Sequence, residues 1–295
     1  MDGATLAPAK VNLFLHVGPV DGDGYHPLAS LVAFADLGDR LSVEPGEALA
    51  LRVTGPFAAG LADEADNLVL RALRALGDVT GTGPPPLRVT LDKHLPLAAG
   101  LGGGSADAGA ALRLARRALD LDLDDAALTQ IAAGIGADGP MCLFARPVWA
   151  EGRGDVLEPA PDLPSLTTVL VNPGLPSPTG AVYRGYDAGP LATADRPAPP
   201  SSWTPAAVID WLAGQRNDLQ APAVALCPAI GTTLAAVTAA PGVRLARMSG
   251  SGGTVFGLCE DAAAARAAAA ALSAAHPHWW VQATVLGHGL QPDDH

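Results

Sequence analysis

Apolar and polar residues alternate near the start of the chain, which predicts a β-strand over residues 9–17. One face of this strand carries four aliphatic residues, Val11, Leu13, Leu15 and Val17. The opposite face carries Lys10, Asn12, Phe14 and His16. Because successive side chains of a strand point to opposite sides, the pattern places Lys10 and Asn12 together on one face of a sheet.

Similar patterns predict a mixture of strands and helices along the rest of the chain. Strands are expected over residues 31–35, 40–44, 49–54, 87–91, 141–145, 166–172, 243–248, 254–259 and 279–286. Helices are expected over residues 66–76, 124–136, 205–213, 217–226 and 261–275, and one more follows a group of glycines. This order predicts an α+β fold whose last segment, with two strands joined by a turn and then a helix and a strand, is ferredoxin-like. The proline-rich segment 158–164 divides the chain into domains over residues 1–160 and 161–295.

Four glycines lie in the segment 100–104, directly before a run with helical spacing. One face of that run carries Ala108, Ala111, Leu112, Ala115 and Leu119. Glycine lets backbone N–H groups approach a ligand, and a helix start adds unpaired N–H groups and the positive end of the helix dipole. Such an arrangement binds anions, so we interpret the segment as a nucleotide phosphate loop. The alternative is a glycine-rich turn that caps a helix without a ligand.

Two familiar phosphate-binding patterns do not fit this loop. No lysine follows Gly104, although a Walker A loop requires one there. Ser105 stands where a dinucleotide-binding pattern counted from Gly100 needs its last glycine. The loop therefore belongs to another class of nucleotide-binding protein.

Composition and charge limit the partners of the chain. It has 295 residues, of which 49% are hydrophobic, and this is enough for two modest domains or one large one. Its formal charge of −12 argues against nonspecific binding to nucleic acid or to an anionic membrane. The three cysteines lack metal-ligand spacing, and neither a signal peptide nor a membrane-spanning run is recognised. We therefore expect a cytoplasmic protein.

The candidate chemistry rests on a few polar residues. Lys10 and Lys93 are the only lysines, so each is a candidate for a site that needs a compact ammonium group. Asp138, in a glycine-rich turn, is the candidate base if it lies beside Lys10, although a turn aspartate is more often a cap. Ser105 is either a ligand of phosphate or Mg²⁺ or a plain helix cap, and Asp107 is treated as structural.

Five motifs occur in order along nearly the whole chain, at residues 8–13, 23–26, 96–105, 136–140 and 249–253. Together they resemble the superfamily of galactokinase, homoserine kinase, mevalonate kinase and phosphomevalonate kinase, the GHMP kinases. The Ala-Lys-Val-Asn-Leu opening and the Gly-Tyr-His triplet are similar to the branch that acts on 4-diphosphocytidyl-2-C-methyl-D-erythritol. Three positions depart from the usual pattern of that branch: His94, Ala106 and Gly139.

The resemblance implies a two-domain GHMP-kinase-like fold, with an N-terminal nucleotide-binding α+β domain and a C-terminal ferredoxin-like α+β domain. It implies ATP-dependent phosphorylation of the 2-hydroxyl of 4-diphosphocytidyl-2-C-methyl-D-erythritol, a small-molecule substrate, in non-mevalonate isoprenoid precursor biosynthesis. A mevalonate or homoserine type of kinase, or an inactive nucleotide-binding protein, remains as an alternative. ATP and Mg²⁺ are the implied cofactors, with unknown metal ligands, and the implied assembly is a monomer or a weak homodimer.

The resemblance also assigns roles to residues. The implied catalytic pair is Lys10 and Asp138. The implied nucleotide contacts are Asn67, Pro96, Leu97, Ala98, Ala99, Gly100, Leu101, Gly102, Gly103, Gly104, Ser105 and Ala106. The implied substrate contacts are Asn12, Tyr25, His26, Thr179 and Tyr183, among which Tyr25, His26 and Tyr183 would recognise the cytosine.

Overall fold

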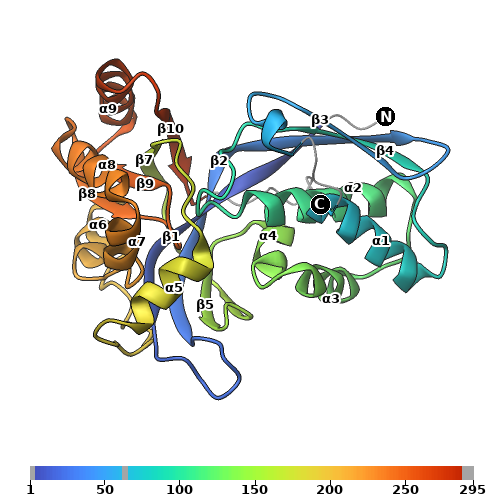
Figure 1. Cartoon of the computed structure of the whole chain (residues 1–295), viewed down its shortest axis with the longest axis horizontal. Helices are drawn as coiled ribbons and strands as arrows, with labels where there is room; N and C mark the ends of the chain where they lie inside the picture. Colours follow the sequence, from blue (N-terminus) through green and yellow to red (C-terminus); the bar gives the residue numbers. More distant parts are fainter. Residues whose placement is uncertain (1–3, 62–65, 288–295) are drawn as a thin grey trace.

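Two long strands run through the middle of the molecule and join its two halves (Figure 1). The computed structural model describes residues 4–61 and 66–287. The two strands, β1 (Thr5–Val17) and β2 (Leu28–Pro45), pair antiparallel. The strand predicted over residues 9–17 is therefore confirmed, and it begins earlier, at Thr5.

The strands predicted separately over residues 31–35 and 40–44 are one continuous strand, β2. Its pairing with β1 continues through the polar middle, where Gly38 faces Pro8. A Cβ atom on Gly38 would lie 2.0 Å from the carbonyl oxygen of Ala7. The glycine therefore keeps the strand in contact with β1 rather than interrupting it.

The first half of the chain covers one side of this hairpin with helices (Figure 1). Its further strands are β3 (Ala50–Thr54), β4 (Leu87–Asp92), β5 (Val148–Gly152) and β6 (Val156–Pro159). Its helices are the 3₁₀ helix η1 (Ala58–Leu61), α1 (Leu68–Thr80), α2 (Gly103–Ala118), α3 (Asp125–Ile135) and α4 (Gly139–Phe144). Residues 106–115 of α2 are all buried, so α2 is the central helix of the hydrophobic core of the first half, which we call the first core.

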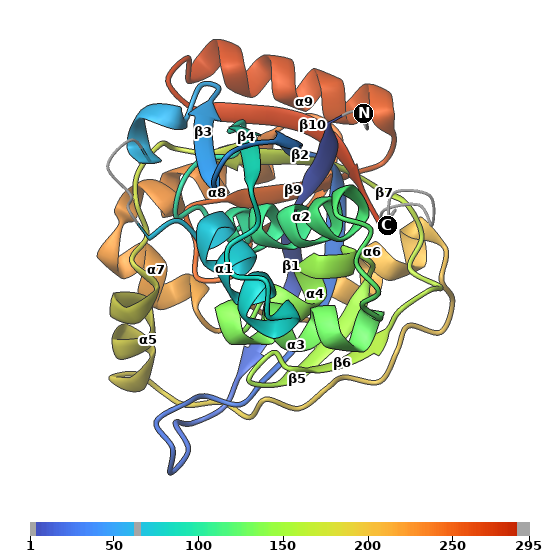
Figure 2. The same cartoon turned by 90° about the vertical axis from the view of Figure 1, so that its right-hand side faces the viewer.

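The second half is a four-stranded antiparallel sheet in the order β10-β7-β9-β8. Its strands are β7 (Leu166–Asn172), β8 (Val243–Met248), β9 (Val255–Cys259) and β10 (Trp280–Leu286). Its helices are α5 (Thr179–Asp187), α6 (Pro205–Ala213), α7 (Gln220–Leu226), α8 (Pro228–Ala239) and α9 (Ala262–Ala275), and α9 lies along β10 (Figure 2). This order confirms the ferredoxin-like prediction, and the pairing of Leu286 with Ala35 joins the sheet to β2.

One predicted strand is wrong, because residues 141–145 belong largely to helix α4. An apolar run of this length cannot distinguish a strand from a buried helical turn. Pro140 stands in the first turn of the helix, where its missing N–H is no loss. Gly109 of α2 lets α4 approach closely, since a Cβ atom there would lie 2.9 Å from the carbonyl oxygen of Cys142. Helices α5 and α8 are further elements that the sequence patterns did not reveal.

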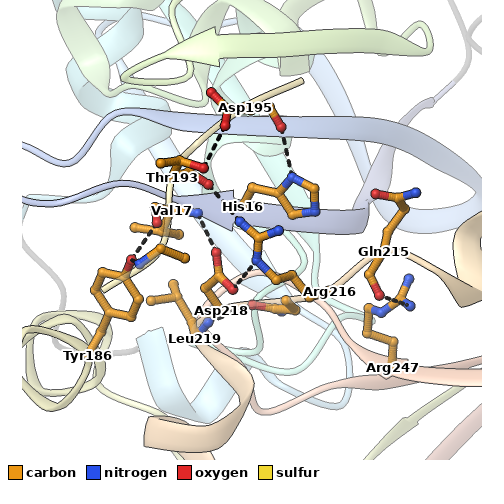
Figure 3. A network of polar contacts seen from close by, with 12 residues as sticks. His16, Val17, Tyr186, Thr193, Asp195, Gln215, Arg216, Asp218, Leu219 and Arg247 are labelled. Atoms are coloured by element: carbon orange, nitrogen blue, oxygen red, sulfur yellow. Dashed lines mark hydrogen bonds and ion pairs between the residues drawn. The ribbon is translucent and has the colours of Figure 1, made fainter. Parts of the chain in front are cut away.

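Polar side chains fasten the end of β1 to the second half (Figure 3). His16 Nδ1 lies 2.9 Å from the carbonyl oxygen of Asp195. Asp218 accepts hydrogen bonds from the backbone N–H of Val17, at 2.8 Å, and from Arg216 Nε, at 2.6 Å. These contacts give the segment around Asp218 a structural role, which the sequence alone did not supply.

The neighbouring Asn217 continues the same connection toward the glycine-rich turn 249–253. Its side-chain amide donates to the carbonyl oxygens of Met248, at 2.8 Å, and Gly250, at 2.9 Å. The segment that holds β1 therefore also holds this turn. Among the helices of the part of the chain that the structure describes, none is long and apolar enough to cross a membrane.

Candidate active site

A cavity of about 790 Å³ opens between the two halves and brings most of the sequence-predicted site residues together. The predicted residues that line it are Lys10, Asn12, Asn67, residues 96–105, Asp138, Thr179 and Tyr183. Ala106 does not line it, because its side chain is fully buried in the first core. Tyr25 and His26 also lie outside the lining, although His26 contacts Tyr183.

The glycine loop enters the cavity and leads directly into α2, which begins at Gly103. Gly103 and Gly104 thus form the first turn of the helix, where backbone N–H groups lack helical partners. Ser105 is the third helical residue and Gly102 is the N-cap, so Ser105 is not the plain cap of the helix. This geometry presents N–H groups and the positive end of the helix dipole to an anion.

The turn 249–253 of the second half holds the glycine loop in this shape. Ser249 Oγ donates to the carbonyl oxygen of Gly100 at 2.9 Å, and the N–H of Thr254 donates to that of Ala99 at 3.0 Å. Gly100 has a positive φ of 73°, and a Cβ atom there would lie 2.5 Å from the carbonyl oxygen of Ser249. The loop and the turn therefore fit together only because glycine stands at this contact.

Lys10 and Asp138 both line the cavity and form an ion pair there. Lys10 Nζ lies 3.2 Å from Asp138 Oδ2 and donates to Asn12 Oδ1 at 3.0 Å. The Lys10 side chain is buried, whereas that of Asp138 is 39% exposed and faces the cavity. Asp138 occupies the N-cap position of α4, yet its side chain makes no cap hydrogen bond to that helix. The carboxylate is therefore oriented toward Lys10 and the cavity instead of serving as a helix cap.

The backbone of Lys10 also touches the glycine loop. Its N–H donates to the carbonyl oxygen of Leu101 at 2.8 Å. Gly102 lies against its side chain, and a Cβ atom on this glycine would be 3.2 Å from Lys10 Cε. Asn12 is fixed in turn, because its amide donates to Ser30 Oγ at 2.8 Å. The ammonium group is thus held at a fixed position beside the loop.

Behind the glycine loop lies a buried ionic cluster, which we call the buried cluster and which consists of Lys93, Asp39 and Asp107. Lys93 Nζ lies 2.5 Å from Asp39 Oδ2 and 2.7 Å from Asp107 Oδ2. Asp39 Oδ1 accepts the N–H groups of His94, at 2.5 Å, and Leu95, at 2.8 Å. The cluster therefore joins the segment that enters the loop to the helix that leaves it. Asp39 carried no sequence signal, because it lies between the two strands predicted over residues 31–35 and 40–44, where an aspartate is unremarkable.

The charges of the buried cluster do not balance. Two carboxylates share one ammonium group, and Asp107 Oδ1 has no hydrogen-bond partner within the described residues. Burial raises the pKa of Asp107 to about 7, with the nearby Asp39 adding to the effect and Lys93 opposing it. Burial lowers the pKa of Lys93, but Asp107 and Asp39 outweigh it and the net shift is upward.

Helix α5 contributes Tyr183 and Thr179 to the lining of the cavity. The rings of Tyr183 and His26 lie 4.8 Å apart between centroids, and His26 Nε2 lies 2.6 Å from Asp187 Oδ1. Burial raises the pKa of the Tyr183 hydroxyl to about 12, so this group stays neutral near pH 7. Thr179 Oγ1 lies 2.8 Å from Ser251 Oγ, which connects α5 to the turn 249–253.

Arg153 also lines the cavity, but it was not identified from the sequence. It lies in the turn between β5 and β6, and its guanidinium lies over the ring of Tyr25, 4.1 Å from the centroid. An arginine between two glycines is a weak signal, because its neighbours come from a distant part of the chain. Tyr25 itself is 56% exposed.

Comparisons with known proteins agree on the class of protein that this chain resembles. A family model described as "GHMP kinases N terminal domain" matches residues 67–146, and one described as "GHMP kinases C terminal" matches residues 207–278. The chain is 53% identical over 282 residues to a 4-diphosphocytidyl-2-C-methyl-D-erythritol kinase of Caulobacter vibrioides (strain NA1000 / CB15N), with 95% of this chain and 97% of that protein covered.

A protein of the same name from Caulobacter sp. (strain K31) is 54% identical over 285 residues, with 96% of this chain and 97% of that protein covered. The crystal structure of a 4-(cytidine 5'-diphospho)-2C-methyl-D-erythritol kinase has a TM-score of 0.77 at 36% identity. That likeness covers 97% of this chain and 100% of the other. The relatives therefore match over nearly their whole length.

Proposed function

Because the chain belongs to the GHMP kinase family, in its branch of 4-diphosphocytidyl-2-C-methyl-D-erythritol kinases, we propose that it transfers a phosphoryl group from ATP to the 2-hydroxyl of 4-diphosphocytidyl-2-C-methyl-D-erythritol. It is an ATP-dependent small-molecule kinase. The observation that carries the proposal is the pair of Lys10 and Asp138, 3.2 Å apart in the cavity that the glycine loop also lines.

In this proposal each part of the cavity has its own task. The loop 96–105 and the first turn of α2 bind the ATP phosphates through backbone N–H groups, and Asn67 lies near the adenine. Asp138 accepts the proton of the attacking hydroxyl, and Lys10, 3.2 Å from this carboxylate, orients it and the acceptor. Phosphoryl transfer needs positioning and charge stabilisation, which this set of groups supplies.

The substrate contacts follow from the same placement. Asn12, fixed by Ser30, and Thr179 of α5 both line the cavity and would hydrogen-bond the acceptor. Tyr183, Tyr25 and His26 would recognise the cytosine by stacking and edge contacts. Closure of Tyr25 over the base is part of the proposal, since this residue stands at the rim and outside the cavity lining.

Mg²⁺ would accompany ATP in this reaction. Mg²⁺ in kinase sites is held by phosphate oxygens, waters and one or two protein groups, and it neutralises charge on the transferred phosphoryl group. Among the described residues, no group of three or more His, Cys, Asp or Glu side chains could hold a metal by itself. Ser105 lines the cavity at the end of the glycine loop, and its hydroxyl would supply a protein oxygen to Mg²⁺.

We further propose a division into domains over residues 1–160 and 161–295, of which residues 1–3, 62–65 and 288–295 lie outside the described residues. The two family models match on either side of this boundary. We also propose that the enzyme acts in the cytoplasm as a monomer or weak homodimer. The three cysteines Cys142, Cys227 and Cys259 form no disulfide, which fits a reducing compartment.

The test is release of ADP by the purified protein with MgATP and one of three acceptors: 4-diphosphocytidyl-2-C-methyl-D-erythritol, mevalonate or homoserine. Turnover with the first acceptor alone is expected. Turnover with mevalonate or homoserine instead would agree with a kinase activity, but it would overturn the assignment of cytosine recognition to Tyr25, His26 and Tyr183. Absence of turnover with all three would overturn the proposed function. Removal of the metal with EDTA should abolish turnover, and Mg²⁺ should restore it.

A further inference from the structure

Arg153 stands at the tip of the β5–β6 hairpin, beside the catalytic pair. It lies between Gly152 and Gly154, both with positive φ, and its own N–H donates to Asp155 Oδ1 at 2.8 Å. The tip packs against α4, because a Cβ atom on Gly154 would lie 3.8 Å from Met141 Cε. Met141 belongs to the helix whose N-cap is the proposed base, Asp138, and Arg153, Gly154, Met141 and Asp138 line the same cavity.

The guanidinium of Arg153 is held by the loop between β1 and β2, which extends from the body of the molecule beside this hairpin (Figure 1). It stacks on Tyr25, and Nη2 lies 2.7 Å from Asp23 Oδ2 and 3.8 Å from Asp21 Oδ2. We call this set, Arg153, Asp21, Asp23 and Tyr25, the exposed cluster. The Arg153 and Asp23 side chains are 40% and 77% exposed. An exposed ion pair of this kind is weak, because water solvates both partners, so another anion can replace the carboxylate easily.

An anionic acceptor substrate needs a cationic side chain in the cavity that is free to bind it. The whole chain carries −12, so an anionic substrate must be attracted locally. Of the basic side chains among the described lining residues, Lys10 is paired with Asp138, and Lys93 is buried between Asp39 and Asp107. Arg153 differs from both, because solvent reaches it and its carboxylate partners lie on an exposed loop.

We propose that Arg153 is a specificity-determining residue that binds the diphosphate of the acceptor substrate. The guanidinium stays over Tyr25 and exchanges the Asp23 carboxylate for phosphate oxygens, for which its planar donor fork is suited. This rests on the proposed function, since it assigns a contact to the diphosphate-bearing acceptor. The ATP phosphates are bound separately, by the glycine loop.

The chain contains a matched control for this residue. Arg196 stacks on Trp149 at 4.2 Å and pairs with Glu158 at 2.6 Å and Glu151 at 3.4 Å. It thus repeats the combination of one arginine, one aromatic ring and two carboxylates. Arg196 is not among the described residues that line the cavity. Arg196→Met therefore removes the same contacts without touching the site.

The experiment compares the KM for 4-diphosphocytidyl-2-C-methyl-D-erythritol, the KM for ATP and kcat in the full-length protein and its variants. Arg153→Met should raise the acceptor KM about tenfold or more, as expected for loss of a charge-assisted contact. Its KM for ATP and its kcat should stay within about threefold of the wild type. Arg153→Lys should give an intermediate acceptor KM, and Arg196→Met should leave all three constants unchanged.

Asp23→Asn separates binding of the diphosphate from simple bracing of the loop. If Arg153 binds the substrate, loss of the competing carboxylate should lower the acceptor KM by about twofold. If Arg153 only braces Tyr25, the same change should raise this KM as Arg153→Met does, and that result would overturn the proposal. An acceptor KM within twofold of the wild type in Arg153→Met would overturn it as well.

Inhibitors that compete with the acceptor provide a second readout, which separates the diphosphate contact from the base contact. Arg153→Met should weaken inhibition by cytidine diphosphate and leave inhibition by cytidine unchanged. Equal weakening of both would place the effect at the base and refute the diphosphate contact. If the wild type fails to turn over the acceptor, the proposed function fails, and direct binding of cytidine diphosphate to the two proteins still tests Arg153.

Discussion

Two ionic clusters flank the cavity, and each places one cation between two carboxylates. In the buried cluster the side chains of Lys93, Asp39 and Asp107 are 3%, 0% and 3% exposed. In the exposed cluster the ionic side chains Arg153, Asp21 and Asp23 are 40%, 43% and 77% exposed. Both clusters combine one basic side chain with two carboxylates, and burial is the largest difference between them.

Burial makes the first cluster part of the scaffold and leaves the second free to change partners. Removing one member of a buried pair leaves an uncompensated charge in a medium of low dielectric constant, whereas water solvates an exposed partner that is left behind. The first cluster therefore fixes the segment that enters the glycine loop to the helix that leaves it. The second is the cluster for which we propose an exchange of its carboxylate for a substrate anion.

The largest effect is expected from Lys93→Met, which leaves Asp39 and Asp107 buried without their cation. We expect the free energy of unfolding to fall by about 3–5 kcal/mol, measured by urea denaturation. The matched change in the exposed cluster, Arg153→Met, should cost less than about 1 kcal/mol. Similar losses in the two variants would show that burial does not separate the clusters.

Asp138→Asn tests the proposed base, which belongs to neither cluster. It should lower kcat by at least about 10²-fold while the Kd for ATP stays within a few-fold, because the amide cannot accept the proton of the acceptor hydroxyl. Steady-state kinetics and calorimetric ATP titration measure the two quantities. The exposed Asp162→Asn serves as control, and near-normal turnover in Asp138→Asn would reject the base.

Gly103→Val links the buried cluster to nucleotide binding. A Cβ atom at this position would lie 3.2 Å from Lys93 Nζ and 3.6 Å from Asp39 Oδ2, so a branched side chain would displace the cluster behind the loop. We expect ATP to bind about tenfold more weakly, by calorimetry, with an unchanged acceptor KM. Gly134→Val is the control, since nothing lies within 4 Å of that position. Unchanged ATP affinity would refute the coupling.

The pH dependence of stability distinguishes the clusters more finely. The pKa of Asp107 is raised to about 7, so the native state binds a proton that the unfolded chain has already released, and stability falls as pH rises toward 7. Relative to Asp107→Asn, the wild type should lose about 1 kcal/mol of unfolding free energy between pH 6 and 7.

Asp21 of the exposed cluster provides the contrast for this measurement. Hydrogen bonding to the backbone of Tyr25 lowers the pKa of its carboxyl, which stays ionised over the same range. Asp21→Asn should therefore show the same pH profile as the wild type in urea denaturation between pH 6 and 7. A flat difference between the wild type and Asp107→Asn would mean that Asp107 is ionised throughout.

The agreement between sequence and structure is best where the signal is local. The alternation over residues 9–17, the ferredoxin-like order of the second half and the start of α2 beside four glycines all depend on neighbours within a few residues. Lys10 and Asp138 were selected by motif, and the cavity brings them together. The apolar run at 141–145 failed as a predictor because packing against α2, and not its own pattern, makes it helical.

The sequence by itself determined the α+β class, the family, the glycine loop before α2 and most residues that line the cavity. Only the tertiary structure decided which charges share a cluster and which of them are buried. Lys93 meets Asp39 across 54 positions, and Arg153 meets Asp23 across 130. Hydrophobic periodicity and glycine content report on backbone preferences over one or two turns. The energy of an ion pair depends on burial and on distant partners, so the different roles of Lys93 and Arg153 exist only in the folded chain.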